Sequence, residues 1–311
     1  MIVLQILLLI LGFVMLIKGA DWFVDGSAGI AARFGIPQIV IGLTIVAMGT
    51  SMPEAAVSIT AAAKGTADIA VGNVIGSNIL NILIILGVTS VIVPVAVQKS
   101  TLYYEIPFML LVTAVLMFLG QRDGRISRLD GAVLWGLFTL YCIYLFFLSR
   151  SKQEEDVLKT SGCKLSRLIL EIVVGGGVVV WGSNLAVDSA SCIAREIGLG
   201  DRIIGLTIVA LGTSLPEFVT SVTAARRGNA DIAIGNIVGS NIFNVLFVLG
   251  TSALIIPLEY GKSFLADGIA AVVSIFLLWL AAFRTGKLGR IAGAVMLLTY
   301  AGYFVYLLAA E

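Results

Sequence analysis

Two glutamates in this sequence carry its strongest chemical signal. Glu54 and Glu217 each lie in the middle of a long apolar segment. An ionised carboxylate placed at the centre of a membrane helix costs roughly 2.5–3.5 kcal/mol. No Lys or Arg lies in the centre of either segment, so a buried ion pair has no evident partner, and protonation is the alternative explanation. We therefore interpret both carboxylates as ligands for a cation.

Other oxygen-bearing side chains accompany each glutamate at helical spacing. Thr50 and Ser51 precede Glu54 at positions that place all three side chains on one side of a helix. Farther along the chain, a polar residue recurs every four positions and forms a stripe. The stripe residues are Asn73, Ser77 and Asn81 in the first half and Asn236, Ser240 and Asn244 in the second half. Thr213 and Ser214 precede Glu217 as Thr50 and Ser51 precede Glu54. Such stripes often only hydrogen-bond neighbouring membrane helices. Beside a buried glutamate, and in duplicate, we favour the interpretation as ligands.

Proline interrupts both polar segments just before the glutamate. Pro53 and Pro216 have no N–H, so the carbonyls of Gly49 and Gly212 are expected to lose their helical partners. Free carbonyls at membrane depth are tolerated where they line a cavity or bind an ion. A simple helix kink is the alternative.

The available ligands are carboxylate, hydroxyl, amide and carbonyl oxygens. This set suits a hard cation such as Ca²⁺, which takes six to eight oxygens, or Na⁺. The chain has no histidine, and its three cysteines (Cys142, Cys163 and Cys192) are scattered, so neither a transition-metal site nor a disulfide framework is indicated. Magnesium fits less well because it tends to keep its waters.

The elements that must position these residues are membrane helices. The chain of 311 residues is 59% hydrophobic and 13% charged, with a mean hydropathy of +1.05. An average soluble domain has about 25% charged residues. Apolar runs separated by glycine, proline and charge clusters predict ten transmembrane helices at roughly 2–32, 37–64, 67–95, 102–120, 128–149, 166–196, 200–226, 230–256, 263–283 and 287–309.

The two halves of the chain are a duplication. A shift of 163 residues aligns Gly42–Ile82 with Gly205–Val245 without a gap, and 27 of these 41 positions are identical. The predicted organisation is a first five-helix repeat at 1–149, a cytoplasmic linker at 150–165 and a second five-helix repeat at 166–311. Because five is odd, the second repeat enters the membrane from the opposite side. The sequence therefore predicts an all-α membrane protein of two inverted-topology repeats, with broken helices at the ion site.

The charges of the predicted loops indicate an orientation. Lys and Arg are more numerous in the loops that are inside if the N-terminus is outside. We therefore expect both termini outside and the linker in the cytoplasm.

At the duplicated motifs the sequence closely resembles the sodium/calcium exchanger family of the cation/calcium antiporter superfamily, in its compact prokaryotic form. The resemblance implies that Glu54 and Glu217 are the central ligands for calcium and sodium. It further implies that the carbonyls of Thr50 and Thr213 complete the calcium site. The flanking sodium sites would be Ser51, Ser77 and the carbonyl of Ala47, and Ser214, Ser240 and the carbonyl of Ala210. Asn81 and Asn244 would line the centre.

Two departures from the family pattern are visible. Some family members have aspartate where this chain has Asn244, so the site here has two acids. The segment at 149–164 is also too short for the calcium-sensing domain of animal members.

The expected function is antiport of Ca²⁺ out of the cell in exchange for Na⁺ by alternating access. One Ca²⁺ on two carboxylates gives a site charge of zero and three Na⁺ give +1, so such an exchange would be electrogenic. Potassium-dependent sodium/calcium exchange and proton/calcium antiport are alternatives, and a cation channel is the alternative outside the transporters. We expect no enzymatic activity, no cofactor and no nucleic-acid partner. The protein is expected to be a monomeric multi-pass protein of the cell (inner or plasma) membrane.

Overall fold

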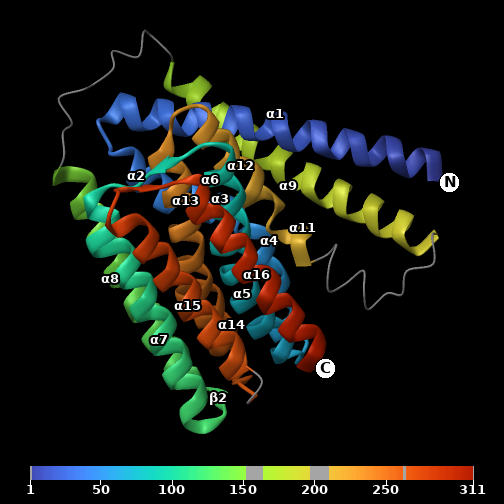
Figure 1. The fold of residues 1–311 in the computed structure, drawn as a ribbon, viewed down its shortest axis with the longest axis vertical. Coiled ribbons are helices and arrows are strands. Elements are labelled where there is room, and N and C mark those ends of the chain that lie inside the picture. Colours follow the sequence, from blue (N-terminus) through green and yellow to red (C-terminus); the bar gives the residue numbers. More distant parts are fainter. Residues whose placement is uncertain (1, 152–163, 197–209, 262–263, 311) are drawn as a thin grey trace.

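The computed structural model describes residues 2–151, 164–196, 210–261 and 264–310. These residues are almost entirely helical, as predicted (Figure 1). The first half contains α1 (Ile2–Phe34), α2 (Gln38–Ile41), η1 (Gly42–Val46), α3 (Ala47–Thr50), α4 (Met52–Ala63), α5 (Ala67–Leu80), η2 (Asn81–Leu86), α6 (Gly87–Ile92), β1 (Val95–Ala96), η3 (Thr101–Glu105), α7 (Ile106–Asp123), β2 (Arg125–Ile126) and α8 (Arg128–Ser151). The second half contains α9 (Leu165–Glu196), α11 (Ala210–Thr213), α12 (Leu215–Arg226), α13 (Ala230–Phe243), η5 (Asn244–Leu249), α14 (Gly250–Ile255), β3 (Leu258–Glu259), α15 (Phe264–Phe283), β4 (Lys287–Leu288) and α16 (Arg290–Ala310). The η elements are π-helical turns.

The described helices match the predicted membrane segments. Eight of them are long and apolar enough to cross a membrane, and a ninth span is a bent pair, Gln38–Thr50 and Met52–Ala63, whose axes differ by 52°. The segment predicted at 200–226 begins outside the described residues and continues as α11 and α12. One of the ten predicted spans, at 200–226, therefore lies partly outside the described residues. Most of the predicted linker, at 152–163, also lies outside them.

The break in the bent pair lies at the repeated polar motif. Ser51 has a φ of −81° and a ψ of 7°, and α4 begins at the next residue. Ser214 has nearly the same conformation, φ −90° and ψ 5°, and α12 begins after it. Proline follows two residues later in both copies, in the first helical turn, where a missing N–H has no helical partner to lose. The predicted break is thus observed in both halves, and the helices that restart there carry the glutamates.

Two long helices lie side by side and cross the rest of the bundle at a steep angle (Figure 1). With 33 residues, α1 is about 50 Å long, which exceeds a hydrocarbon core of about 30 Å and requires a strong tilt. It packs antiparallel to α9 through small residues. A Cβ at Gly19 would stand 2.8 Å from the backbone nitrogen of Val179, and one at Gly12 would stand 2.8 Å from that of Ala186. Only glycine permits this approach.

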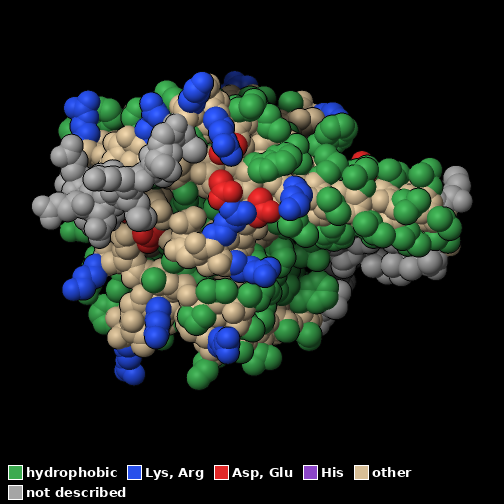
Figure 2. Space-filling model, turned by 90° about the horizontal axis from the view of Figure 1, so that it is seen from above, with side chains coloured by type: hydrophobic (Ala, Val, Ile, Leu, Met, Phe, Trp, Pro, Cys, Tyr) green, Lys and Arg blue, Asp and Glu red, His purple; other side chains and the backbone are tan. Residues whose placement is uncertain are grey.

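The helices with polar stripes lie at the centre of the molecule. In the span Ala230–Ile255, 94% of the most apolar stretch is buried, whereas the corresponding figure for α1 is 17%. The polar stripes on these helices therefore face the protein interior. Seen from above, the projecting part of the molecule is covered by hydrophobic side chains, and Lys and Arg side chains are distributed over the remaining face (Figure 2). The exposed apolar residues of α1 include Val3, Leu4 and Leu7.

Four two-residue strands are an addition to the predicted all-helical fold. Strand β1 pairs antiparallel with β4, and β2 pairs antiparallel with β3. Each pair joins a loop of the first half to a loop of the second half. Hydropathy could not reveal these strands, because two residues have no periodicity and their partners lie far away in the chain.

Candidate cation site

Both glutamates of the repeated motif are completely buried. Glu54 lies in the first turn of α4 and Glu217 in the first turn of α12, and each is 0% exposed. The N-terminus of a helix carries partial positive charge from its unpaired N–H groups, which favours a carboxylate in this position. The break in each segment therefore supplies an electrostatic environment that a continuous helix would lack.

Each carboxylate is held by a serine from the other half of the chain. Ser51 Oγ donates to Glu217 Oε1 at 2.8 Å, and Ser214 Oγ donates to Glu54 Oε1 at 3.0 Å. The two hydrogen bonds are related by the same shift of 163 residues that relates the motifs. The two copies of the motif are thus brought together in one site.

Four buried oxygens in this region accept no hydrogen bond from the described residues. They are Glu54 Oε2, Glu217 Oε2, Asn81 Oδ1 and Asn244 Oδ1. A buried acceptor without a partner normally costs roughly 1–3 kcal/mol, and more if it is charged. These four oxygens form two pairs related by the repeat and are candidate ligands for a hard cation.

The remaining predicted ligands lie at the breaks before α4 and α12 and on the neighbouring helices α3, α5, α11 and α13. Thr50 and Ser51 are buried at the end of α3 and at the break, and Ser77 and Ser240 are buried on α5 and α13. Ser240 Oγ donates to the carbonyl of Ala47 at 3.4 Å, so the structure links these two residues across the halves. Thr213 ends α11 and is half-buried, and Ala210 is the first residue of that helix.

Asn73 and Asn236, each one helical turn before the serine of its stripe, support the helices that carry the glutamates. Asn73 Nδ2 donates to Ser58 Oγ at 2.9 Å, and Asn236 Nδ2 donates to Ser221 Oγ at 2.9 Å and to the carbonyl of Glu217 at 3.3 Å. Asn236 Oδ1 also accepts from Thr50 Oγ1 at 3.0 Å. Two members of the predicted stripes therefore act as supports of the site.

Sequence reasoning missed Asn78 and Asn241. Both are buried and bind one another across the molecular centre, since each side-chain nitrogen donates to the other's backbone carbonyl, at 3.1 and 3.0 Å. The sequence does offer one indication of them, because both are asparagine at matching positions of the two repeats, directly after Ser77 and Ser240. They do not belong to the four-residue spacing that defines the stripes.

The two carboxylates have no basic partner among the described residues. In the described part of the chain, no Lys or Arg forms an ion pair with Glu54 or Glu217, and the sequence has no histidine. The described residues also hold no cluster of three or more His, Cys, Asp or Glu side chains suited to a metal ion. With two acids and many neutral oxygens, the arrangement fits a transported hard cation better than a resident transition metal.

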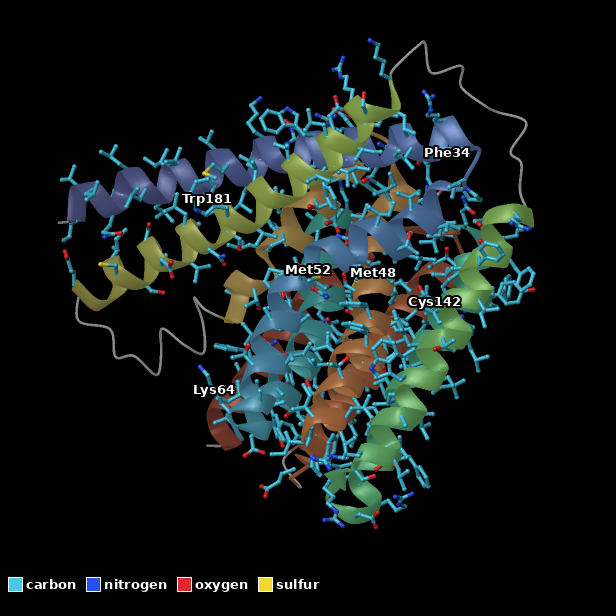
Figure 3. The ribbon with its side chains drawn as sticks, turned by 180° about the vertical axis from the view of Figure 1, so that it is seen from behind. Phe34, Met48, Met52, Lys64, Cys142 and Trp181 are labelled. Carbon is cyan, nitrogen blue, oxygen red and sulfur yellow. The ribbon has the colours of Figure 1, made fainter. Side chains whose placement is uncertain are left out.

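The outer faces of the surrounding helices are apolar. Met52, which follows the break, is 55% exposed, and Trp181 on α9 is 68% exposed (Figure 3). Cys142 on α8 and Cys192 on α9 are free, and Cys163 lies outside the described residues.

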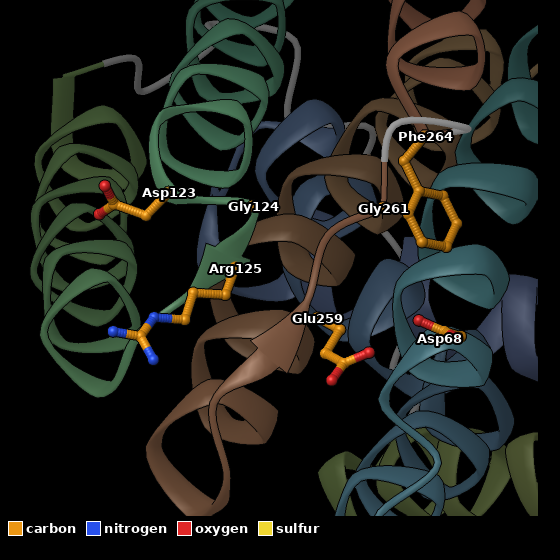
Figure 4. Close-up of a pocket in the computed structure, with 7 residues that line it drawn as sticks. All are labelled: Asp68, Asp123, Gly124, Arg125, Glu259, Gly261 and Phe264. Carbon is orange, nitrogen blue, oxygen red and sulfur yellow. The ribbon is translucent and has the colours of Figure 1, made fainter.

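A separate cavity of about 440 Å³ opens at one end of the bundle (Figure 4). Asp68, Asp123, Glu259 and Arg125 contribute charged side chains to it. None of its lining residues belongs to the buried site.

The fold and site define a multi-pass membrane transporter for cations. The sequence model of the family described as "Sodium/calcium exchanger protein" matches residues 4–148 and 168–309. The chain is 34% identical to the sodium/calcium exchanger MaX1 of Methanosarcina acetivorans over 348 residues, covering 99% of each chain. It is 35% identical to the inner membrane protein YrbG of Escherichia coli over 314 residues, covering 96% of this chain and 94% of that one. Its fold superimposes on a solved structure of the sodium-calcium exchanger NCX_Mj, soaked with Na⁺ and Sr²⁺, with a TM-score of 0.87, 33% identity and coverage of 98% of this chain and 99% of that one.

The chain therefore belongs to the sodium/calcium exchanger family. It is a secondary transporter of cations that include Ca²⁺ and Na⁺, and it is neither an enzyme nor dependent on a cofactor.

Proposed function

We propose that this protein extrudes Ca²⁺ in exchange for Na⁺ by alternating access. The observation that carries the proposal is the pair of buried glutamates, each held by a serine from the other half and each with one oxygen that accepts no hydrogen bond within the described chain. Calcium and sodium compete for these oxygens. Binding of either ion reduces the magnitude of the charge on the site, and a site with less charge can be carried through an apolar barrier at lower cost.

We assign the ligands as follows. Glu54 and Glu217 bind both ions. The remaining proposed ligands are Thr50, Thr213, Ser51, Ser214, Ser77, Ser240, Asn81, Asn244 and the carbonyls of Ala47 and Ala210. The burial of Ser51, Ser77, Ser214 and Ser240 and the hydrogen bonds of Ser51 and Ser214 to the two carboxylates support this set.

The two repeats are inverted in the membrane, with ten spans and both termini outside. Matched contacts related by 163 residues support the repeat, and among them are the Ser51–Glu217 and Ser214–Glu54 hydrogen bonds. Such repeats place the substrate site near the bilayer midplane, where the halves meet. The protein functions as a monomer in the cell membrane.

The exchange moves net charge. Two carboxylates carry −2, so one Ca²⁺ brings the site to zero and three Na⁺ bring it to +1. A cycle that exchanges three Na⁺ for one Ca²⁺ therefore responds to the membrane potential.

Calcium uptake into sodium-loaded proteoliposomes tests the proposal, with the membrane potential clamped and external potassium and pH varied. Uptake that needs internal sodium, ignores potassium and increases when the interior is made positive is expected, because each cycle carries one net positive charge outward. Uptake that requires potassium on the calcium-binding side, or a pH gradient in place of sodium, would replace the proposal with one of the two alternative exchangers. Ion currents too large for a transport cycle would indicate a channel.

A further inference from the structure

Four buried asparagines meet where the two halves of the chain touch. Asn78 and Asn241 lie near the ends of α5 and α13, and Asn81 and Asn244 begin the π-helical turns η2 and η5. None of the four is more than 5% exposed. A π-helical turn inserted at the same place in both repeats often marks a functional position.

Their hydrogen bonds form a closed, two-fold pattern. Asn78 Nδ2 donates to the backbone carbonyl of Asn241 at 3.1 Å, and Asn241 Nδ2 donates to the backbone carbonyl of Asn78 at 3.0 Å. Asn244 Nδ2 donates to Asn78 Oδ1 at 3.2 Å, and Asn81 Nδ2 donates to Asn241 Oδ1 at 3.0 Å. Asn81 Oδ1 and Asn244 Oδ1 accept nothing from the described residues.

This pattern fixes which end of each amide faces which neighbour. A backbone carbonyl can only accept, so the carbonyl of Asn241 requires the nitrogen of Asn78 to face it. The oxygen of Asn78 is then the atom left for Asn244, which must present its nitrogen to Asn78. The amide oxygen of Asn244 is consequently turned away from Asn78. The equivalent contacts of Asn241 in the other half turn the oxygen of Asn81 away from Asn241 in the same manner.

We propose that Asn78 and Asn241 are positioning residues that hold the amides of Asn244 and Asn81 with their oxygens available to the transported cation. This inference rests on the proposed function and deepens it. If either amide turned over, its NH₂ group, which is the positive end of the dipole, would face a Ca²⁺ or Na⁺ ion and repel it. Hard cations bind amide oxygens and not amide nitrogens. We assign Asn78 and Asn241 no ligand role, because their side-chain oxygens accept hydrogen bonds from Asn244 and Asn81, whereas the oxygens of Asn81 and Asn244 accept none from the described residues.

A double-mutant cycle on calcium affinity tests the proposal, measured by titration calorimetry on the full chain in detergent without sodium. Asn78→Ala is expected to weaken calcium binding about tenfold, the worth of one hydrogen bond of ordinary strength. In an Asn244→Ala background the same change is expected to have less than about a twofold effect, because no amide remains to be oriented. The mirror cycle of Asn241 with Asn81 is expected to behave identically.

The crossed pair Asn78 and Asn81 is the matched control. Asn78 does not hold Asn81, so their effects on affinity are expected to multiply. Multiplicative effects for Asn78 with Asn244 as well would overturn the proposal and leave the asparagines as packing contacts. If an alanine variant fails to fold, Asn78→Ser and Asn241→Ser replace it, since a hydroxyl retains one donor and one acceptor.

The same preparations distinguish a failure of the proposed function from a failure of the positioning role. Wild-type protein that takes up no calcium in exchange for sodium would overturn the proposed function and this inference with it. Wild-type exchange together with multiplicative cycles overturns the positioning role alone.

Discussion

Ser51 Oγ lies 2.8 Å from Glu217 Oε1, although 166 residues separate the two in the chain. Its counterpart, Ser214, reaches Glu54 from the second half at 3.0 Å. Each half of the molecule therefore supplies a carboxylate whose orientation depends on the other half. Any movement that separates the two halves at this point disturbs both carboxylates at once, which suits a site that must bind and release ions together.

Ser51→Ala is expected to lower the affinity for calcium in sodium-driven uptake about 10- to 100-fold, because a hydrogen bond to a charged group is worth about 1.5–3 kcal/mol. The measurement is initial uptake rate against calcium concentration in proteoliposomes. Ser274→Ala is the matched control, since Ser274 is equally buried but donates to the carbonyl of Ala271 within α15. Equal effects of the two substitutions would show that the Ser51 contact has no special role.

Glu54→Gln and Glu217→Gln are each expected to abolish calcium uptake, with affinity reduced about 100-fold or more, because a buried cation loses a charged partner. The folded protein is expected to survive, since glutamine removes an uncompensated buried charge while preserving size. Calcium uptake and thermal unfolding in detergent without calcium measure the two effects. A fully active variant at either position would refute the assignment of that glutamate as a ligand.

Gly19→Ala is expected to destabilise the protein by about 1–3 kcal/mol, because the new Cβ would stand 2.8 Å from the backbone of α9 at Val179. Thermal unfolding in detergent reports the loss as a lower midpoint. Gly177→Ala is the control within α9, because no described atom lies within 4 Å of a Cβ at that position. It is expected to leave the midpoint unchanged or raise it through better helix propensity. A lower midpoint for Gly177→Ala alone would contradict the described α1–α9 interface.

Arg227 connects α1 to the end of α12 through ion pairs with Asp21, at 2.6 Å, and with Asp25. The hydrogen bond that the Arg227 guanidinium donates to Asp25 is the main cause of its raised pKa, with the hydrogen bond to Asp21 adding to it. Because the three side chains are partly exposed, Arg227→Ala is expected to reduce stability by only about 1 kcal/mol or less. Hydrogen exchange of α1 amides near Asp21 is expected to increase a few-fold, and to do so less in high salt. Arg226→Ala is the neighbouring control, and an equal increase in that variant would rule out a role for these ion pairs.

The local content of the site was predictable from sequence. The cost of a carboxylate in an apolar span singled out Glu54 and Glu217, and the duplication gave the two matching halves. Proline and glycine placed the breaks within a residue or two, because their effects are confined to one helical turn. Nine helical spans were predicted close to their observed bounds for the same reason: hydropathy is a property of contiguous residues.

The partners of these residues depend on the packing of distant helices. Spacing along one helix placed Ser51 on the same side as Glu54, whereas in the fold Ser51 donates its hydrogen bond to Glu217. The same holds for the pairing of β1 with β4 and for the reciprocal contact of Asn78 with Asn241. The periodicity of polar residues along each segment determines which face of that helix is polar. The packing of α3, α5, η2 and their counterparts decides which polar face meets which, because that choice depends on contacts between segments about 160 residues apart.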